Sequence, residues 1–408
     1  MIKLLLLLVP VFIYAENLKS LLEYANKNNN LVISKKLTQD AKAKEVDSRE
    51  SSFYPTIDVG SSLQSLNERS PFTPGVVYSG YAKVGFDIYD GGRKSSMTEQ
   101  KISEHKASNF DVEAMKNSIT LQIVQDFYTL KSLEASLLSR DDAKKSLMAQ
   151  LERMQRFYSA KVATKDDVDR LQSAYDTNIY EIESIKLQIF SVKKSLELKV
   201  TKEIGTLDDS KFKELVQSEY ELSESIKSLI ATQNSILKTA EAISSSYYPQ
   251  VRVEDTYSLY GYDKTDALHP EGADNQNKLL LTLNLRVFDN ASIKKEKEAV
   301  VINAQALGSE IEYKKHEQKL QYEVALSRIN TSKVKIISAK SALVSANSAF
   351  ELISKKYDAG IVDNIVYLDA LNTQTNAKAL YETSLNDLEI AYAVYYYYAG
   401  KNIEEFLQ

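Results

Sequence analysis

The chain has 408 residues, of which 43% are hydrophobic and 26% charged, with only 12 glycines, 6 prolines, 3 histidines and no cysteine. So few helix-breaking residues favour long helices, and the lack of cysteine excludes a disulfide framework, thiolate catalysis and a cysteine-ligated metal. The net charge of −5 gives no electrostatic reason to expect nucleic acid as a partner.

Residues 1–15 have the pattern of a secretory signal peptide. Lys3 precedes an apolar run from Leu4 to Tyr14, and polar residues follow Ala15. This run is shorter than the about 20 residues of a membrane-spanning helix, although a membrane anchor or a buried first helix is an alternative. Because no later apolar run has spanning length, we expect an exported protein without transmembrane helices.

Landmarks that occur twice divide the chain into two repeats. The pairs are Tyr54-Pro55 with Tyr248-Pro249, Tyr89-Asp90 with Phe288-Asp289, and Tyr158-Ser159-Ala160 with Tyr357-Asp358-Ala359. Such self-similarity indicates a duplicated supersecondary unit. We predict a first repeat over residues 16–205 and a second over 206–408, each containing a helix, a β-hairpin, a very long helix, a turn and another helix.

Each repeat contains two segments in which apolar and polar residues alternate, as in half-buried strands. The Tyr-Pro pairs end the preceding helices, and polar loops near residues 65–77 and 262–277 separate the segments. The clearest apolar positions are Val251, Val253, Tyr257, Leu259, Leu279, Leu281, Leu283, Leu285 and Val287. These patterns predict β-hairpins over about 55–90 and about 249–289.

Two proline-free segments follow the hairpins and are predicted as very long helices, at about 92–158 and about 291–358. Their apolar residues recur at coiled-coil spacing. After a turn, helices at about 166–200 and about 364–399 return along them. A helix of about 66 residues extends roughly 100 Å, too long for a globular core, so we expect antiparallel coiled-coil pairs.

The four predicted strands cannot close a barrel by themselves. Strands of about 10 residues with one apolar face suit a transmembrane β-barrel, but an open edge in lipid leaves backbone groups unsatisfied. Two copies would give 8 strands and three would give 12, and the larger barrel has room to conduct. The expected fold class is therefore mainly α with transmembrane β. The alternative is that each hairpin packs on a soluble helical layer.

Several motifs in this order resemble the TolC family of outer-membrane efflux proteins. They are the runs Phe86–Arg93, Tyr357–Gly360 and Leu368–Leu371, together with the signal segment and the duplication. The resemblance implies a homotrimer in the cell outer membrane, with a 12-stranded barrel in contact with lipid and a coiled-coil helical barrel forming a tunnel in the periplasm. It also implies docking to a periplasmic adaptor and an inner-membrane pump, and passive conduction of substrates in tripartite efflux or type I secretion.

No pattern in the sequence predicts an enzyme. His105, His269 and His316 lack metal-ligand spacing. The run Asp90–Arg93 has the glycines of a phosphate loop but lacks the Lys-Ser/Thr pair that grips a nucleotide. We therefore expect no catalytic residue, no metal and no cofactor, and a gate instead of a reaction.

Acidic residues near the two helix-helix turns are candidates for this gate. Asp166 and Asp363 follow the turns and suit helix capping equally well, because carboxylates favour the positive end of a helix. Asp369 lies too deep in its helix to cap it. In a threefold assembly it would form a ring of three carboxylates, as in cation-selective pores.

The resemblance implies further gate positions at the periplasmic end. Asp369 falls on one of the family's pore-constricting aspartates. The remaining gate positions match Val366 in place of the second aspartate, Val362 in place of the gate arginine, and Tyr357, Asp166 and Asp167. With valines at two of these positions, we expect a constriction held less by ion pairs and more by packing.

The turns themselves are the expected adaptor-docking surfaces. Their residues are Ala160, Lys161 and Val162 in the first turn and Ala359, Gly360 and Ile361 in the second. Two alternatives are an exported periplasmic coiled-coil adaptor, which usually has one helical hairpin flanked by small β domains, and an exported structural protein, which would explain the helices without the strands. No pattern in the sequence identifies the exported substrate or the cognate pump.

Overall fold

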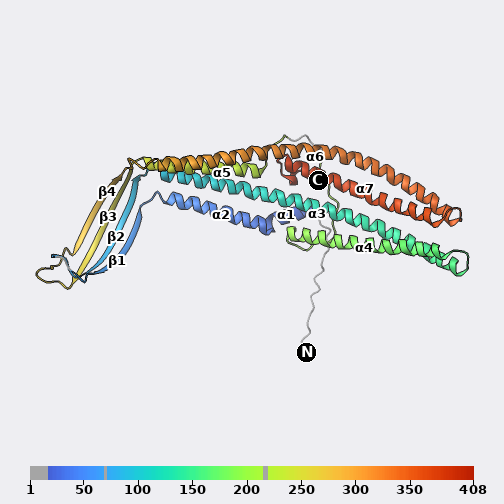
Figure 1. Cartoon of the computed structure of the whole chain (residues 1–408), viewed down its shortest axis with the longest axis horizontal. Helices are drawn as coiled ribbons and strands as arrows, with labels where there is room; N and C mark the ends of the chain where they lie inside the picture. The colour runs from blue at the N-terminus through green and yellow to red at the C-terminus, as the bar shows by residue number, and fades with distance from the viewer. Residues whose placement is uncertain (1–16, 69–70, 215–218) are drawn as a thin grey trace, which may run out of the picture. The chain divides into compact units, whose positions relative to one another are not determined.

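The computed structural model describes residues 17–68, 71–214 and 219–408, so the predicted signal segment 1–15 lies outside the described residues. The elements are α1 (Leu18–Asn28), α2 (Asn30–Ser51), β1 (Thr56–Ser65), β2 (Val76–Tyr89), α3 (Arg93–Ser159), α4 (Lys165–Val200), α5 (Glu224–Ser244), β3 (Gln250–Asp263), β4 (Asn275–Asn284), α6 (Ser292–Asp358) and α7 (Asn364–Tyr398), with short 3₁₀ turns at Ser245–Tyr247 and Ile403–Phe406 (Figure 1). Within these described ranges, no helix combines the length and the apolar character needed to cross a bilayer.

Asn29 divides the first helical segment into α1 and α2, where the sequence predicts one helix. Its backbone N–H donates to the Ala25 carbonyl at 2.8 Å and closes α1. Its side-chain oxygen accepts from the backbone N–H groups of Leu31 at 2.9 Å and Val32 at 3.3 Å. These are the contacts of a helix N-cap, so one buried asparagine ends α1 and begins α2.

The four strands form one antiparallel sheet in the order β1-β2-β3-β4, and Figure 1 shows them side by side in this order. The two hairpins come from different repeats, and the β2–β3 pairing joins them. β4 ends at Asn284, although the alternating pattern continues to Val287. The reason is that Asn284 lies opposite Gln250, the first residue of β3, so residues beyond it have no strand to pair with.

The two faces of the sheet differ in polarity. One face is apolar and exposed on all four strands, and it includes Ile57, Val59, Val84, Leu259, Leu279, Leu281 and Leu283. On the other face the Lys83 amine lies 3.7 Å from the Glu254 carboxylate, and Arg252 pairs with Asp87 at 2.8 Å. Among the described strands, β1 and β4 are the edges of the sheet. An exposed apolar face with two open edges requires a partner.

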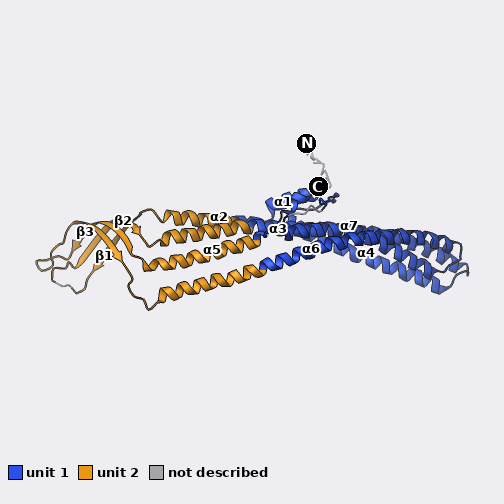
Figure 2. Cartoon of the chain, turned by 90° about the horizontal axis from the view of Figure 1, so that it is seen from above, with its two compact units in different colours: residues 1–36, 112–224, 314–408 blue, residues 37–111, 225–313 orange. Residues whose placement is uncertain are grey.

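The chain divides into two compact units, and each unit draws on both repeats (Figure 2). Unit 1 comprises residues 1–36, 112–224 and 314–408, and unit 2 comprises 37–111 and 225–313, including the sheet. The described core of unit 1 combines α1, α3, α4, α6 and α7. Its largest fully buried side chains include Phe127, Tyr128, Tyr395 and Tyr396.

Phe212, which lies between the repeats, packs within unit 1 against the end of the second repeat. Phe212 forms a β-bridge with Leu407, close to the C-terminus. Its backbone N–H donates to the carboxylate of Glu389 in α7 at 2.7 Å. Burial raises the pKa of Glu389, and the hydrogen bond from Phe212 opposes that shift. The carboxyl group therefore ties the inter-repeat segment to a helix that lies far from it in the sequence.

Candidate functional site

Unit 1 contains two helix-helix turns, one between α3 and α4 and one between α6 and α7. The backbone N–H of Val162 donates to the Phe157 carbonyl, and that of Ile361 donates to the Lys356 carbonyl, both at 2.8 Å. The preceding residue, Lys161 or Gly360, has a φ of 60° or 71°. This is the left-handed C-terminal cap of a helix, which glycine adopts without strain and lysine at a cost.

The six residues predicted to dock an adaptor are all exposed at these turns. They are Ala160, Lys161, Val162, Ala359, Gly360 and Ile361. Val162 is 76% exposed and Ile361 is 70% exposed. Because the two turns have the same backbone geometry, each presents one aliphatic side chain at the equivalent position.

The acidic residues after the turns have different roles. Asp363 caps α7 by accepting from the backbone N–H groups of Ile365 and Val366, both at 3.1 Å. In the other turn Asp167, and not Asp166, takes part in capping, because the N-cap of α4 is Thr164 and Asp167 completes its capping box. Asp166 instead accepts a hydrogen bond at 2.8 Å from Nε of Arg170, within the same helix.

Two polar links join the turns of the first and second repeats. The Arg153 guanidinium, near the end of α3, pairs with the Asp358 carboxylate and also donates to the Asp358 carbonyl at 3.1 Å. In the opposite direction, Nδ2 of Asn364 in α7 donates to the carbonyl and the carboxylate of Asp167, both at 3.2 Å. Each α-helical hairpin therefore supplies one donor side chain to the other.

Tyr357 lies inside this cluster and stacks on Tyr367, with ring centroids 4.7 Å apart and an angle of 25° between the planes. Its hydroxyl group is buried and has no hydrogen-bond partner within the described chain. Burial raises the pKa of Tyr357, against the opposing effect of Arg153, and burial raises the pKa of Tyr367 to about 12. Arg153 also lies over the Tyr357 ring at 5.9 Å, a favourable cation–π geometry.

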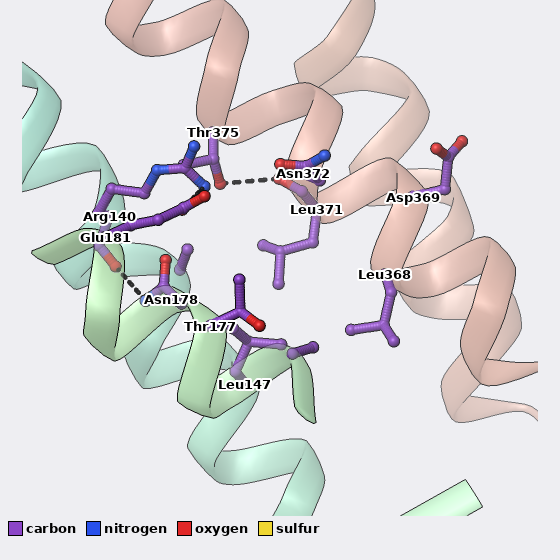
Figure 3. A pocket seen from close by; sticks show the side chains of 12 residues that line it. Arg140, Leu147, Thr177, Asn178, Glu181, Leu368, Asp369, Leu371, Asn372 and Thr375 are labelled. Carbon is purple, nitrogen blue, oxygen red and sulfur yellow. Dashed lines mark hydrogen bonds and ion pairs between the residues drawn. The ribbon is translucent and has the colours of Figure 1, made fainter. Parts of the chain in front are cut away.

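The other predicted gate residues lie around this cluster. Val362 is partly buried and packs against the hydrophobic cluster that contains Tyr357 and Tyr367. Val366 is 40% exposed. Asp369 is exposed on α7, and its carboxylate points away from Leu371 (Figure 3). The structure thus brings Tyr357, Val362 and Asp167 together and places Asp166, Val366 and Asp369 on the surface of this single chain.

The histidines do not gather at any site. His269 pairs with Asp266 at 2.7 Å in a loop of unit 2, while His105 and His316 lie on α3 and α6. Over the described part of the chain, no group of three histidine and carboxylate side chains is placed to hold a metal ion. The polar side chains near the turns link helices to one another and do not converge on a reacting atom.

Comparisons with known proteins show similarity to outer membrane efflux proteins. Residues 21–189 match the family model described as outer membrane efflux protein. The outer membrane protein TolC of Vibrio cholerae is 21% identical over 414 residues, covering 94% of this chain and 91% of that protein.

Solved structures match the fold over almost the whole chain. The CmeC outer membrane channel of Campylobacter jejuni has a TM-score of 0.84 at 16% identity and covers 94% of this chain and 86% of that one. The outer membrane protein VceC of Vibrio cholerae has a TM-score of 0.80 at 13% identity and covers 95% and 96%. The expected fold class, mainly α with four β-strands, is confirmed. The chain is therefore similar over almost its whole length to TolC, and residues 21–189 match the outer membrane efflux proteins.

Proposed function

We propose that three copies of the chain form one duct, in which twelve strands close a barrel in the outer membrane and the helices form a tunnel in the periplasm. The observation that carries this proposal is the sheet with an apolar face and two open edges. β1 and β4 both have 10 residues, within the 9–11 of a transmembrane strand. In four consecutive antiparallel strands the first and last run in opposite directions, so β4 of one copy can pair with β1 of the next.

Three copies are favoured over two because an 8-stranded barrel is filled by its own side chains, whereas twelve strands enclose a lumen. The helices of unit 1 also require neighbours. On α4, Tyr180, Leu187 and Leu198 are 73%, 68% and 78% exposed. Such a stripe of apolar residues on a helix is usually covered by another helix, and here a second copy of the chain supplies it.

The two turns form the proposed periplasmic gate. In each subunit, the links from Arg153 to Asp358 and from Asn364 to Asp167 hold the α6–α7 hairpin against the α3–α4 hairpin. Separation of the hairpins requires both links to break. Opening is therefore opposed by two sets of polar contacts within every subunit.

The charge and packing of the proposed gate depend on three residues, Asp369, Val366 and Val362. Threefold symmetry would place three Asp369 carboxylates around the closed end, which favours cations. Val362 packs against the hydrophobic cluster that contains Tyr357 and contributes to closure by burial. Asp166 pairs with Arg170 in its own helix, so this ion pair adds no net charge at the rim. The closed state is held by packing together with charge.

The exposed turns are the proposed docking surface for a periplasmic adaptor, which connects the duct to an inner-membrane pump in tripartite efflux or type I secretion. Val162 and Ile361 provide two equivalent apolar contacts in each subunit. The segment 1–15 provides the export signal. Residues 16–205 and 206–408 are the two copies of an ancestral unit.

The lack of cysteine in the chain permits a direct test of the barrel. Val59→Cys in β1 is combined in turn with Leu279→Cys, Leu281→Cys and Leu283→Cys in β4, and membranes are oxidised. Pairing between copies should yield disulfide-linked species of up to three chains. The control is Ala82→Cys with Tyr257→Cys, which are register partners in β2 and β3 and should link only within one chain.

The mass of the extracted protein is the companion measurement. A detergent-dependent complex of three chains is expected. A monomer or dimer that is soluble without detergent, with no cross-linked trimer from any edge pair, would contradict the barrel and favour a periplasmic adaptor or structural protein.

A further inference from the structure

In the described sheet, the charged side chains of the polar face that lack an opposite charge all lie along the two edges. On β1, Asp58 is exposed and forms no ion pair within the described chain. Lys83, its register partner on β2, lies 3.7 Å from Glu254 instead. On the opposite edge, Lys278 of β4 and Arg286 just beyond it are also exposed and without an ion pair in the described ranges. One edge is therefore acidic and the other basic, and such edges attract each other.

The strand β4 also ends before its alternating pattern does. Leu285 and Val287 continue the apolar positions beyond Asn284, and they are 50% and 88% exposed. No strand of the same chain lies opposite them, because β3 begins at Gln250. A strand of another copy on the free edge of β4 gives this continuation a partner if its pairing extends past Asn284.

The faces of the sheet limit how β4 of one copy can pair with β1 of the next, a junction that we call the seam. A shift by one residue would exchange the polar and apolar faces, so Leu279 can lie opposite only those residues of β1 that share its apolar face. Within one copy, the three strand registers place Leu279 level with Ile57 of β1. The residue of the next β1 that faces Leu279 therefore gives the stagger of the sheet across one subunit.

The tilt of the strands limits this stagger further. The tangent of the tilt is the total stagger along the strands divided by the width of the closed sheet across them. For twelve strands about 4.8 Å apart, with about 3.3 Å per residue, staggers of two, four, six and eight residues per subunit give tilts of about 19°, 35°, 46° and 54°. Transmembrane strands tilt by about 35–45°, so staggers of four and six remain, which place Leu279 opposite Ser61 or Leu63. The opposite direction of stagger would place Leu279 beyond the start of β1.

The apolar side chains distinguish these two registers. With Leu279 opposite Leu63, two leucines face each other, and Leu285 gains a partner in β1. With Leu279 opposite Ser61, Leu63 instead faces the polar Asn277, and Leu285 lies beyond the first residue of β1. Because cross-strand apolar pairs stabilise a sheet, both observations favour the register that pairs Leu279 with Leu63.

The same register brings the opposite charges of the two edges together. It places Asn284 opposite Asp58, and Arg286 occupies the diagonal position, within reach of a long side chain. In the alternative register, Asp58 lies about 13 Å along the strands from both Arg286 and Lys278. Charge, apolar pairing and the continuation of β4 thus agree on one register.

From this agreement we propose that β4 of one copy pairs with β1 of the next with Leu279 opposite Leu63, and that Arg286 forms an ion pair with Asp58 across each seam. The inference rests on the proposed barrel and specifies how its subunits join. Pairing of two β1 edges would bring two Asp58 carboxylates together, and pairing of two β4 edges would bring cations together. The edge charges therefore favour closure into a ring over pairing of like edges.

Cysteine pairs across the seam test the register in the full-length protein in oxidised membranes. Leu63→Cys with Leu279→Cys should form disulfide-linked chains at least about fivefold faster than Leu63→Cys with Asn277→Cys, the matched pair for the alternative register. An equal or faster reaction with Asn277→Cys would overturn the register and leave the barrel intact. No linked chains from either pair would also overturn it, and the Val59→Cys pairs described above then decide whether the barrel fails as well.

Charge reversal tests the ion pair. Asp58→Arg should speed the dissociation of heated trimers in detergent by about tenfold, because it brings cations together at three seams. Adding Arg286→Asp should restore the rate of the parent. Adding Lys278→Asp in its place is the matched control and should not restore it. Rescue by Lys278→Asp, or no rescue by Arg286→Asp, would overturn the ion pair, whereas a parent that forms no trimer would contradict the proposed duct and the seam with it.

Discussion

Removal of the Arg153 guanidinium is expected to favour the open gate. The Arg153 side chain is 28% exposed and that of Asp358 is 54% exposed, so their ion pair contributes about 0.2–1 kcal/mol. The hydrogen bond to the Asp358 carbonyl adds about 0.5–1.5 kcal/mol. The Tyr357 ring in α6, 5.9 Å from the guanidinium, adds about 0.5–1 kcal/mol. A total of about 1.2–3.5 kcal/mol corresponds to about 8- to 370-fold in the closed-to-open equilibrium of each subunit.

The assay is single-channel recording of Arg153→Gln in planar lipid bilayers, with open probability as the measured quantity. We expect a rise of about eightfold or more. Arg170→Gln is the matched control, because it removes the same charge from a pair that lies within α4, Arg170 with Asp166. An unchanged open probability in Arg153→Gln, or an equal rise in Arg170→Gln, would refute the reasoning.

Three further predictions concern buried groups and the pore. Tyr357→Phe should raise the melting temperature, because it removes a buried hydroxyl that has no partner within the described chain. Tyr128→Phe should lower the melting temperature, because the Tyr128 hydroxyl donates to the Ser210 carbonyl at 2.9 Å. Each change in stability should be about 1 kcal/mol by calorimetry, and shifts of the same sign would contradict the assignment. Burial raises the pKa of Glu389, so its contribution to stability is present in acid and lost as the pH rises through the raised pKa. Glu389→Gln should therefore stabilise the protein at neutral pH and lose this advantage in acid, as measured by melting temperature against pH; a constant difference would exclude titration of this group. Asp369→Asn should reduce the permeability of cations relative to anions, measured by reversal potential in a salt gradient, and unchanged selectivity would remove Asp369 from the pore.

Periodic features of the fold were predictable from the sequence. A strand repeats every two residues and a helix every 3.6, so the alternation around Leu281 and the proline-free run before Tyr158 predict their elements. The end of β4 at Asn284 was not predictable in this way, because it depends on where β3 begins at Gln250. A strand needs a partner as well as a pattern.

The candidate site was less predictable than the fold. The resemblance to a family supplied the positions of Tyr357 and Asp369, but Arg153 was missed. A single arginine on the polar side of a long helix gives no periodic signal, and Asp358 is distant in the sequence. Whether Asp166 or Asp167 takes part in capping α4 depends on which residue is the N-cap. A shift of one position along a helix rotates the side chain by about 100° around the axis.

The order of the strands also imposes an order on folding. β2 pairs with β3 from the other repeat, so the inner edge of the β1–β2 hairpin stays open until the chain has been delivered as far as residue 263. Pairing between distant strands is slow, and open strand edges aggregate meanwhile. A chain that is delivered N-terminus first thus exposes the unpaired, aggregation-prone edge of the β1–β2 hairpin while most of the second repeat is still to follow. Its yield in the cell should depend on a periplasmic chaperone that covers this edge during the delay.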